Sequence, residues 1–338
     1  MTYGDVIRYN CEHIRPQWWP KYAYHFTDVT NVVSILSSGN LYSRVQADRR
    51  GIMGNDNASR QVIDMTKTQA TAYARFYFRP LTPTQYYNEG FKHRDIRYCG
   101  DAYANVPVPV FLVFDLEKLL SDDSTMFSAQ SQAGYGCPIR QGIEAFSQLP
   151  FEKIYSNGPC DSETLHYRHA ELLYPDFYPI DDSLKMILCR NECEKATLLN
   201  LLRKDEAKTY YRYKDSIRVA REYMFQRNGL FVESAVYHDD IISFAFAQTS
   251  DKKKFDRKHA SNQLSKLNVF FQFQWTNKKG LVLYSATREV FLDYLSPSSL
   301  SFTNLPTIPN AATITVTLRI DDKIICISRH PLIPYEVV

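Results

Sequence analysis

Glycine is scarce in this sequence, with 12 glycines among 338 residues. Neither a Walker nor a Rossmann glycine motif is present, which excludes the common glycine-rich phosphate-binding loops. Hydrophobic runs are also short, and none approaches the roughly 20 residues that a membrane-spanning helix needs. Residues 1–5 lack the features of a signal peptide. We therefore expect a cytoplasmic protein that has no membrane partner.

The cysteine content and the net charge do not indicate a specialised class of protein either. The seven cysteines are scattered and odd in number, which argues against a disulfide framework. Cys189 and Cys193 lie close together, but no second pair and no histidine pair is near them, so we expect buried thiols and no metal site. The formal net charge is only +3, which is too small to argue for a polybasic binder from net charge alone. Any contact with nucleic acid must be a local patch.

Aromatic residues, by contrast, are abundant, with 24 tyrosines and 20 phenylalanines. Such residues favour strands. The hydrophobic fraction of 44% and the charged fraction of 23% are typical of a chain that folds. Because one core usually covers about 100–200 residues, the length of 338 predicts about two domains.

The first helix follows a short aromatic strand. Residues 22–26 favour a strand, and apolar residues at helical spacing predict a helix over residues 27–39. Thr27 or Asp28 can cap the start of this helix, and Gly39 can end it in a left-handed turn. The sequence thus predicts a strand, a polar turn and a helix.

Two polar stretches interrupt the elements that follow. Residues 43–71 are polar and basic, and we expect a long surface loop there. Residues 121–142 form a second polar stretch, and an aromatic segment follows at residues 167–174. Strands are predicted at residues 76–80, 108–114 and 183–189, and helices at residues 191–202 and 215–226.

Beyond Gly229 the sequence changes to short strand-like segments separated by turns. This spacing predicts a β sandwich or partial barrel of roughly 110 residues. We divide the chain into a first domain at 1–228, with its core at 22–204 and a helical linker at 205–228, and a β-rich accessory domain at 229–338. The strands expected in the second domain lie at residues 241–246, 269–275, 280–284, 312–320 and 324–328.

Three segments of the first domain carry the chemistry. They are His25-Phe26-Thr27 at the strand-to-helix turn, Phe76-Tyr77-Phe78-Arg79-Pro80 after the basic loop, and Tyr167-Arg168-His169-Ala170-Glu171. In this order and spacing they resemble the DarT family, toxins that transfer ADP-ribose from NAD+ to bases of single-stranded DNA. The resemblance covers about residues 23–202. It implies an α/β (α+β) ADP-ribosyltransferase fold with a split mixed sheet, and NAD+ as the co-substrate.

Glu171 is the candidate catalytic residue. Cleavage of NAD+ passes through a transition state that resembles an oxocarbenium ion, and a nearby carboxylate stabilises its positive charge. The same carboxylate can accept a proton from the attacking base nitrogen and so act as a general base. The alternative is that Glu171 is a solvated charge at the end of a strand.

The remaining NAD+ contacts follow from the resemblance. It implies that His25 holds the nicotinamide ribose, although a histidine beside aromatic residues is also typical of a core. Arg60 is our choice for a catalytic arginine of the basic loop, which meets the NAD+ phosphates or the target base. Its rivals are Arg49, Arg50 and Arg75. The predicted NAD+-binding set is His25, Phe26, Thr27, Gly39, Arg60 and Tyr77, the last of which either stacks on nicotinamide or fills the core.

The acceptor is predicted from fewer residues. Ser128, Gln130, Arg168 and His169 are the candidate substrate contacts. Transferases that modify arginine often carry a glutamate two positions before the catalytic one, where this chain has His169, and this difference argues against an arginine acceptor. A base nitrogen must be unpaired to attack, and aromatic side chains with basic neighbours suit unstacked bases, which favours single-stranded nucleic acid.

The expected function is NAD+-dependent ADP-ribosylation of a base in single-stranded DNA, by a toxin of a toxin–antitoxin or antiphage system. The resemblance suggests a macrodomain antitoxin as a partner. The same chemistry on RNA is the strongest alternative. Two further alternatives are a catalytically silent nucleic-acid-binding or protein-binding module, and a ribonuclease that uses His25, His166 or His169 as acid and base. Lysines at 252–254 and 278–279 mark either a binding platform or a solvated loop.

Overall fold

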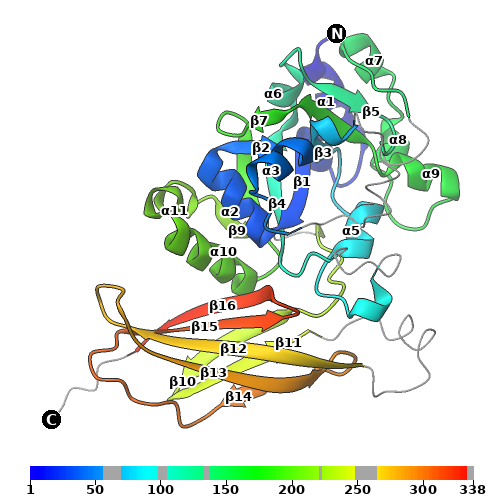
Figure 1. Cartoon of the computed structure of the whole chain (residues 1–338). Helices are drawn as coiled ribbons and strands as arrows, with labels where there is room; N and C mark the ends of the chain where they lie inside the picture. Colours follow the sequence, from blue (N-terminus) through cyan, green and yellow to red (C-terminus); the bar gives the residue numbers. More distant parts are fainter. Residues whose placement is uncertain (56–69, 98–104, 133–136, 221–222, 248–264, 333–338) are drawn as a thin grey trace.

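The computed structural model describes residues 1–55, 70–97, 105–132, 137–220, 223–247 and 265–332. Helices surround one mixed sheet in the first part of the chain, and two further sheets lie below it in Figure 1. The expected fold class, α/β followed by a β-rich region, is confirmed. Among the described helices, none is both long and apolar enough to cross a membrane.

The mixed sheet has the order β5-β6-β3-β1-β4-β8-β9, in which only the β8–β9 pair is parallel. The central strand is β1, and its neighbour β4 is an interior strand whose residues are buried from Pro109 to Phe114, as the continuous apolar run predicts. A separate two-stranded ribbon joins β2 and β7. The strands are β1 Tyr22–Asp28, β2 Asn40–Tyr42, β3 Tyr73–Tyr77, β4 Pro109–Asp115, β5 Met126–Ser128, β6 Glu171–Pro175, β7 Phe177–Pro179, β8 Leu184–Cys189 and β9 Ile217–Val219.

Capping residues set the ends of the principal helices. Asp28 accepts a hydrogen bond from the Thr30 amide (3.1 Å) at the start of α2, and Gly39 ends α2 at a φ of 69°. Asn191 caps α10 through the Glu194 amide (2.9 Å). The α-helices are α1 Tyr3–His13, α2 Val29–Ser38, α3 Arg44–Arg50, α5 Pro83–Asn88, α6 Leu116–Leu120, α7 Ile143–Ser147, α8 Phe151–Ile154, α9 Ser162–Tyr167, α10 Glu192–Asp205 and α11 Ala207–Tyr213.

The last part of the chain forms a β sandwich, as the strand spacing predicts. Alternate side chains of β12, including Phe271, Phe273 and Trp275, are buried between the sheets with Ile242 and Phe244 of β11. One sheet has the order β10-β11-β14 and the other β13-β12-β15-β16. The strands are β10 Val232–His238, β11 Ile241–Phe246, β12 Lys266–Thr276, β13 Val282–Asp293, β14 Leu300–Phe302, β15 Thr313–Ile320 and β16 Lys323–Pro331.

Helix α10 joins the mixed sheet to the sandwich, because it covers the edge strand β16 (Figure 1). The Asn200 side chain donates to the carbonyl of Ile327 (3.1 Å), and the Ile327 amide donates to the Thr197 hydroxyl (2.9 Å). These bonds satisfy backbone groups that an edge strand would otherwise expose.

A buried charge cluster reinforces this junction. Arg190, at the end of β8, forms ion pairs with Glu194 of α10 and with Glu89, which follows α5 (3.4 Å for the latter). Glu89 also accepts hydrogen bonds from the amides of Gln226 (2.8 Å) and Arg227 (2.7 Å). Because removing one partner would leave an uncompensated buried charge, the cluster fixes the segment that leads into the sandwich.

Several predicted elements differ from the observed ones. The helix expected at 215–226 is wrong: β9 occupies Ile217–Val219 and pairs with β8, whereas the helix α11 lies earlier in the chain. Within the expected loop at 43–71, residues Arg44–Arg50 form α3. The strand predicted at 76–80 begins and ends earlier, at Tyr73–Tyr77. Helix α1 and strands β10 and β14 were not predicted.

Candidate active site

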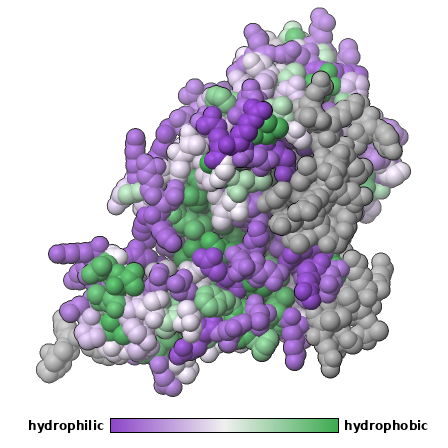
Figure 2. Space-filling view, in the orientation of Figure 1, coloured by the Kyte–Doolittle hydropathy of each residue, from purple (hydrophilic) through white to green (hydrophobic). Residues whose placement is uncertain are grey.

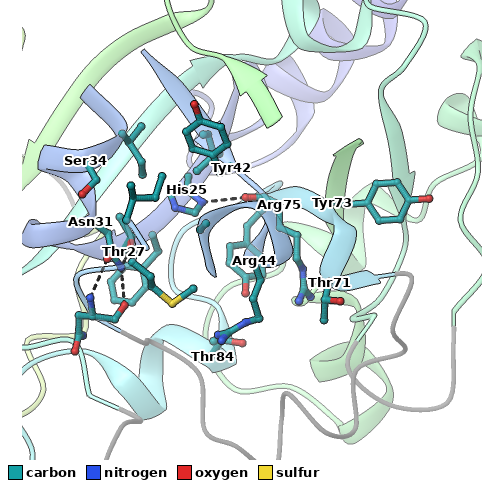
Figure 3. A pocket seen from close by; sticks show the side chains of 18 of the residues that line it. His25, Thr27, Asn31, Ser34, Tyr42, Arg44, Thr71, Tyr73, Arg75 and Thr84 are labelled. Carbon is teal, nitrogen blue, oxygen red and sulfur yellow. Dashed lines mark hydrogen bonds between the residues drawn. The ribbon is translucent and has the colours of Figure 1, made fainter. Parts of the chain in front are cut away.

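A cavity of about 240 Å³ opens between β1, β3, α2 and α3 (Figure 3). Its wall combines a histidine and two arginines with tyrosine rings and short polar side chains. This mixture of apolar surface and a few polar groups is typical of a small-molecule site. The side chains that the argument uses are His25, Thr27, Asn31, Arg44, Arg75 and Tyr77.

An ion pair between Arg75 and Glu171 lies behind this wall. Strands β3 and β6 are neighbours, and Glu171, the first residue of β6, stands opposite Tyr77. The Arg75 Nε donates to Glu171 Oε2 (2.7 Å) and its Nη2 donates to Oε1 (2.5 Å). The Glu171 side chain is 1% exposed, whereas the Arg75 side chain is 29% exposed and lines the cavity. Arg75 is thus the link between the carboxylate and the cavity.

The electrostatics of the pair follow from this geometry. Burial alone would lower the pKa of Arg75, but the charge of Glu171 raises it above its ordinary value, so the guanidinium stays charged. Burial and the same carboxylate raise the pKa of the Tyr77 phenol. Tyr77 therefore remains a neutral phenol beside the ion pair.

Strand β5 supports Glu171 from its other side. Ser128 stands opposite Glu171 in the β5–β6 pair, and its hydroxyl donates to the carbonyl of Gln130 (2.8 Å). Gln132 donates its side-chain amide to the Ser128 hydroxyl (2.8 Å) and its backbone amide to Glu171 Oε1 (3.4 Å). The predicted contact Ser128 is thus joined to the carboxylate through Gln132, which sequence reasoning missed, and Gln130 contacts Ser128 through its carbonyl.

His25 is held by the backbone of the same arginine. Its Nδ1 lies 2.9 Å from the carbonyl oxygen of Arg75, the bond dashed in Figure 3. A carbonyl can only accept, so Nδ1 carries the proton and Nε2 keeps a lone pair. Burial lowers the pKa of His25 to about 4. The imidazole is therefore neutral and can accept a hydrogen bond near neutral pH.

Asn31 is a second residue that sequence reasoning missed. Its Nδ2 donates to the Thr27 hydroxyl (3.0 Å) and to the Asn55 carbonyl (2.8 Å). Its Oδ1 accepts from the amides of Gly54 (2.9 Å) and Asn55 (3.0 Å). Asn31 therefore ties the residues after α3 to the first turn of α2, and its position one helical turn after Thr27 was the available signal.

Arg168 and His169 lie between α9 and β6. Arg168 donates to the Ser156 hydroxyl (3.1 Å) and to the Gly158 carbonyl (2.7 Å), and so supports a neighbouring loop. Burial, followed by the charges of His166 and Arg75, lowers the pKa of His169 to about 4. His169 is therefore neutral and close enough to Arg75 to sense its charge.

The structure brings most of the predicted residues together. His25, Phe26, Thr27 and Tyr77 line the cavity, and Arg75, named as a rival of Arg60, is the arginine that pairs with Glu171. Gly39 does not line this cavity, because it ends α2 beside a different hollow. Arg60 and the lysines at 252–254 fall outside the described residues.

Comparison with known proteins identifies the first part of the chain. The sequence model of the family described as "ssDNA thymidine ADP-ribosyltransferase, DarT" matches residues 24–225, which is more than half of the chain. No curated protein matches.

Three solved structures show weak similarity. DarT of Thermus sp. 2.9 in complex with NAD+ is 17% identical, with a TM-score of 0.46 over 61% of this chain and 98% of that chain. The same protein in complex with ADP-ribosylated ssDNA is 16% identical, with a TM-score of 0.45 over 60% and 94% of the two chains. Thermosipho africanus DarTG in complex with ADP-ribose is 15% identical, with a TM-score of 0.44 over 54% and 47%.

Proposed function

The chain belongs to the DarT family of ADP-ribosyltransferases, which use NAD+, and we propose that it transfers ADP-ribose from NAD+ to a base of single-stranded DNA. The observation that carries the proposal is the buried carboxylate of Glu171, which Arg75 connects to the cavity that contains His25. NAD+ cleavage needs a fixed negative charge close to the ribose, and the carboxylate of Glu171, held in place by two hydrogen bonds from Arg75, is the candidate for it.

In the proposed reaction, the bond between C1′ of the ribose and the nicotinamide nitrogen breaks while a base nitrogen attacks C1′. Nicotinamide leaves with the bonding electrons, and Glu171 stabilises the positive charge that develops on the sugar. The proton of the attacking nitrogen then passes to a carboxylate oxygen of Glu171. Arg75 is a positioning residue in this scheme, because its two hydrogen bonds orient the carboxylate.

His25 and the tyrosines supply binding in the same scheme. The unprotonated Nε2 of His25 accepts a hydrogen bond from a ribose hydroxyl, while its Nδ1 remains on the Arg75 carbonyl. Tyr77, a neutral phenol beside the ion pair, offers a ring against which nicotinamide can stack. Arg44 lines the cavity and brings a positive charge suited to the NAD+ diphosphate.

The proposed biological role is that of a toxin in a toxin–antitoxin or antiphage system, acting in the cytoplasm. ADP-ribose on a DNA base blocks pairing, so a cell that carries this activity needs an opposing enzyme, and an ADP-ribosyl-removing macrodomain protein is the partner we propose. We also propose that residues 229–338 form an accessory domain. Its attachment by α10 and the Glu89–Arg190 pair supports a fixed position beside the catalytic part.

The test is to incubate the purified protein with NAD+ and matched DNA and RNA oligonucleotides and to weigh the products by mass spectrometry. An ADP-ribose adduct on single-stranded DNA, lost in Glu171→Gln, is expected. Glu163→Gln is the matched control, because Glu163 is an exposed glutamate. Within the described residues, its ion pair is with Lys153 on the surface.

Other results would overturn the proposal in distinguishable ways. An adduct found only on RNA would show that RNA, and not DNA, is the acceptor, since the ribose 2′-hydroxyl is the group that distinguishes the two substrates. Cleaved RNA without NAD+ would indicate a ribonuclease. Tight oligonucleotide binding without an adduct or nicotinamide release would indicate a silent binding module.

A further inference from the structure

Strand β13 forms an open edge of the sandwich. Within the described residues, β13 pairs only with β12, so the other side of this 12-residue strand has no hydrogen-bonded neighbour (Figure 1). An edge of this length presents a row of backbone donors and acceptors to any strand of matching side chains. At the opposite edge of the same sheet, α10 covers β16.

The side chains of this edge are unusually apolar for an exposed surface. Four consecutive apolar residues, 281–284, are exposed, with Leu281 at 64%, and Phe291 near the other end of β13 is 73% exposed. Figure 2 shows an apolar patch at the end of the sandwich where β12 turns into β13. A run of exposed apolar residues on an unpaired edge strand makes association more favourable than the free monomer. This indicates that another surface covers the edge.

The order of residues along β13 is self-complementary. When a strand pairs antiparallel with its own copy, the two-fold axis passes between the two copies of one residue. A residue a given number of positions before that residue in one strand then faces the residue the same number of positions after it in the other strand. With the axis at Ala286, Ser285 of one copy faces Thr287 of the other. Tyr284 of one copy likewise faces Arg288 of the other. Their β12 partners, Trp275 and Phe271, lie on the same face of the sheet, so Tyr284 and Arg288 also lie on one face.

The same axis matches the ends of the strand. Phe291 of one copy comes opposite or diagonal to Leu281 and Val282 of the other, so the most exposed apolar side chains meet. The irregularity in the β12–β13 register beside Val282 shifts this pairing by one position at most. Asp293 of one copy comes beside Lys278 and Lys279 of the other, which brings opposite charges together and separates like charges by the length of the strand.

We propose that β13 pairs with β13 of a second copy of this chain, antiparallel about a two-fold axis at Ala286. The pairing joins two four-stranded sheets into one continuous sheet and leaves the catalytic cavity of each copy outside the interface. It covers the exposed apolar residues, places Arg288 over Tyr284 of the partner as a cation–π pair, and removes both open edges. The proposal does not depend on the catalytic function proposed above.

Sedimentation velocity over a wide range of protein concentrations tests the association. We expect a dimer at high concentration that is lost in the double variant Leu281→Asp/Phe291→Asp. The control variant Tyr211→Asp changes an equally exposed aromatic residue on α11, away from β13, and should leave the dimer intact. A chain that stays monomeric, or a dimer that survives the double variant, would overturn the proposal.

A cysteine cross-link tests the position of the axis without removing the apolar surface. Ala286→Cys should form a disulfide between two copies under mild oxidation, and peptide mass spectrometry should locate it at residue 286. Glu289→Cys is the control, because a position three residues from the axis lies about 20 Å from its own copy. A link at 289 but not at 286, or no link at 286 in a dimer, would exclude this pairing. Circular dichroism establishes that each variant is folded.

Discussion

The ion pair between Arg75 and Glu171 should respond asymmetrically to the loss of either partner. Glu171 is almost wholly buried, whereas Arg75 keeps 29% of its side chain exposed. Arg75→Met leaves an uncompensated carboxylate in the interior and should lower the free energy of unfolding by about 3–5 kcal/mol. Glu171→Gln leaves the charge on the partner that reaches solvent and should cost only about 1–2 kcal/mol.

The double variant Arg75→Met/Glu171→Gln separates pairing from packing. Because it removes both charges together, we expect it to be more stable than Arg75→Met alone, with a coupling energy of about 2–3 kcal/mol. Urea unfolding followed by tryptophan fluorescence and circular dichroism measures these values. Additive losses, or an Arg75→Met variant that is no less stable than Glu171→Gln, would refute the reasoning from burial.

The same cycle separates stability from turnover. At a temperature where all variants are folded, Glu171→Gln should reduce ADP-ribose transfer by at least 10²- to 10³-fold, a loss typical of removing one electrostatic stabiliser of a transition state. Arg75→Lys should retain more activity than Arg75→Met, because a lysine restores the charge but not the two parallel hydrogen bonds. Equal activity of these two variants would show that the charge alone has no effect, and undiminished activity of Arg75→Lys would exclude a positioning role for the guanidinium.

Three further outcomes follow from geometry. Burial lowers the pKa of His25 from 6.5 to about 4, so its neutral form stabilises the fold above pH 6.5, and this stabilisation is lost as the pH falls from 6.5 to 4. When unfolding is followed against pH, the loss of unfolding free energy should be up to about 3 kcal/mol larger than in His25→Asn, which keeps the similar contribution of His169. Asn31→Ala breaks four hydrogen bonds beside the cavity and should raise KM for NAD+ more than it lowers kcat in steady-state kinetics. Gly90→Ala places a methyl group 2.0 Å from the Asn228 carbonyl oxygen and should lower Tm far more than Gly280→Ala, which has a similar positive φ but open space.

Elements with a local signal were predictable from the sequence. Asp28 and Gly39 flank α2, Asn191 caps the start of α10, and the unbroken apolar run of β4 corresponds to a buried interior strand of the sheet. In each case, the capping residue or the burial pattern lies within the element itself. The sandwich was predictable for the same reason. Apolar residues alternate with more polar ones along β12, and this alternation distinguishes the buried face of the strand from the exposed one.

Elements that depend on distant partners were not predictable. Ile217 pairs with Ile187 on β8, and this parallel pairing overrides the helical composition of residues 215–226. Helix α3 has no buried residue, so its sequence lacks the apolar periodicity from which a helix could be predicted. In the site, Arg75 and Glu171 are 96 positions apart, so their pairing exists only once β3 and β6 are neighbours.

The end of α5 and the residues after it connect the cavity beside His25 to the sandwich. Asn88 lines that cavity, Glu89 joins the Arg190 cluster, and the ring of Phe91 is packed inside the sandwich with Leu230. Residues 88–91 thus lead from the wall of the cavity to the core of the sandwich. A protein cut after residue 228 would lack Leu230 and the sandwich, and so would expose the buried ring of Phe91 to water. Removing the sandwich should therefore also disturb the segment that ends in Asn88 at the wall of the cavity.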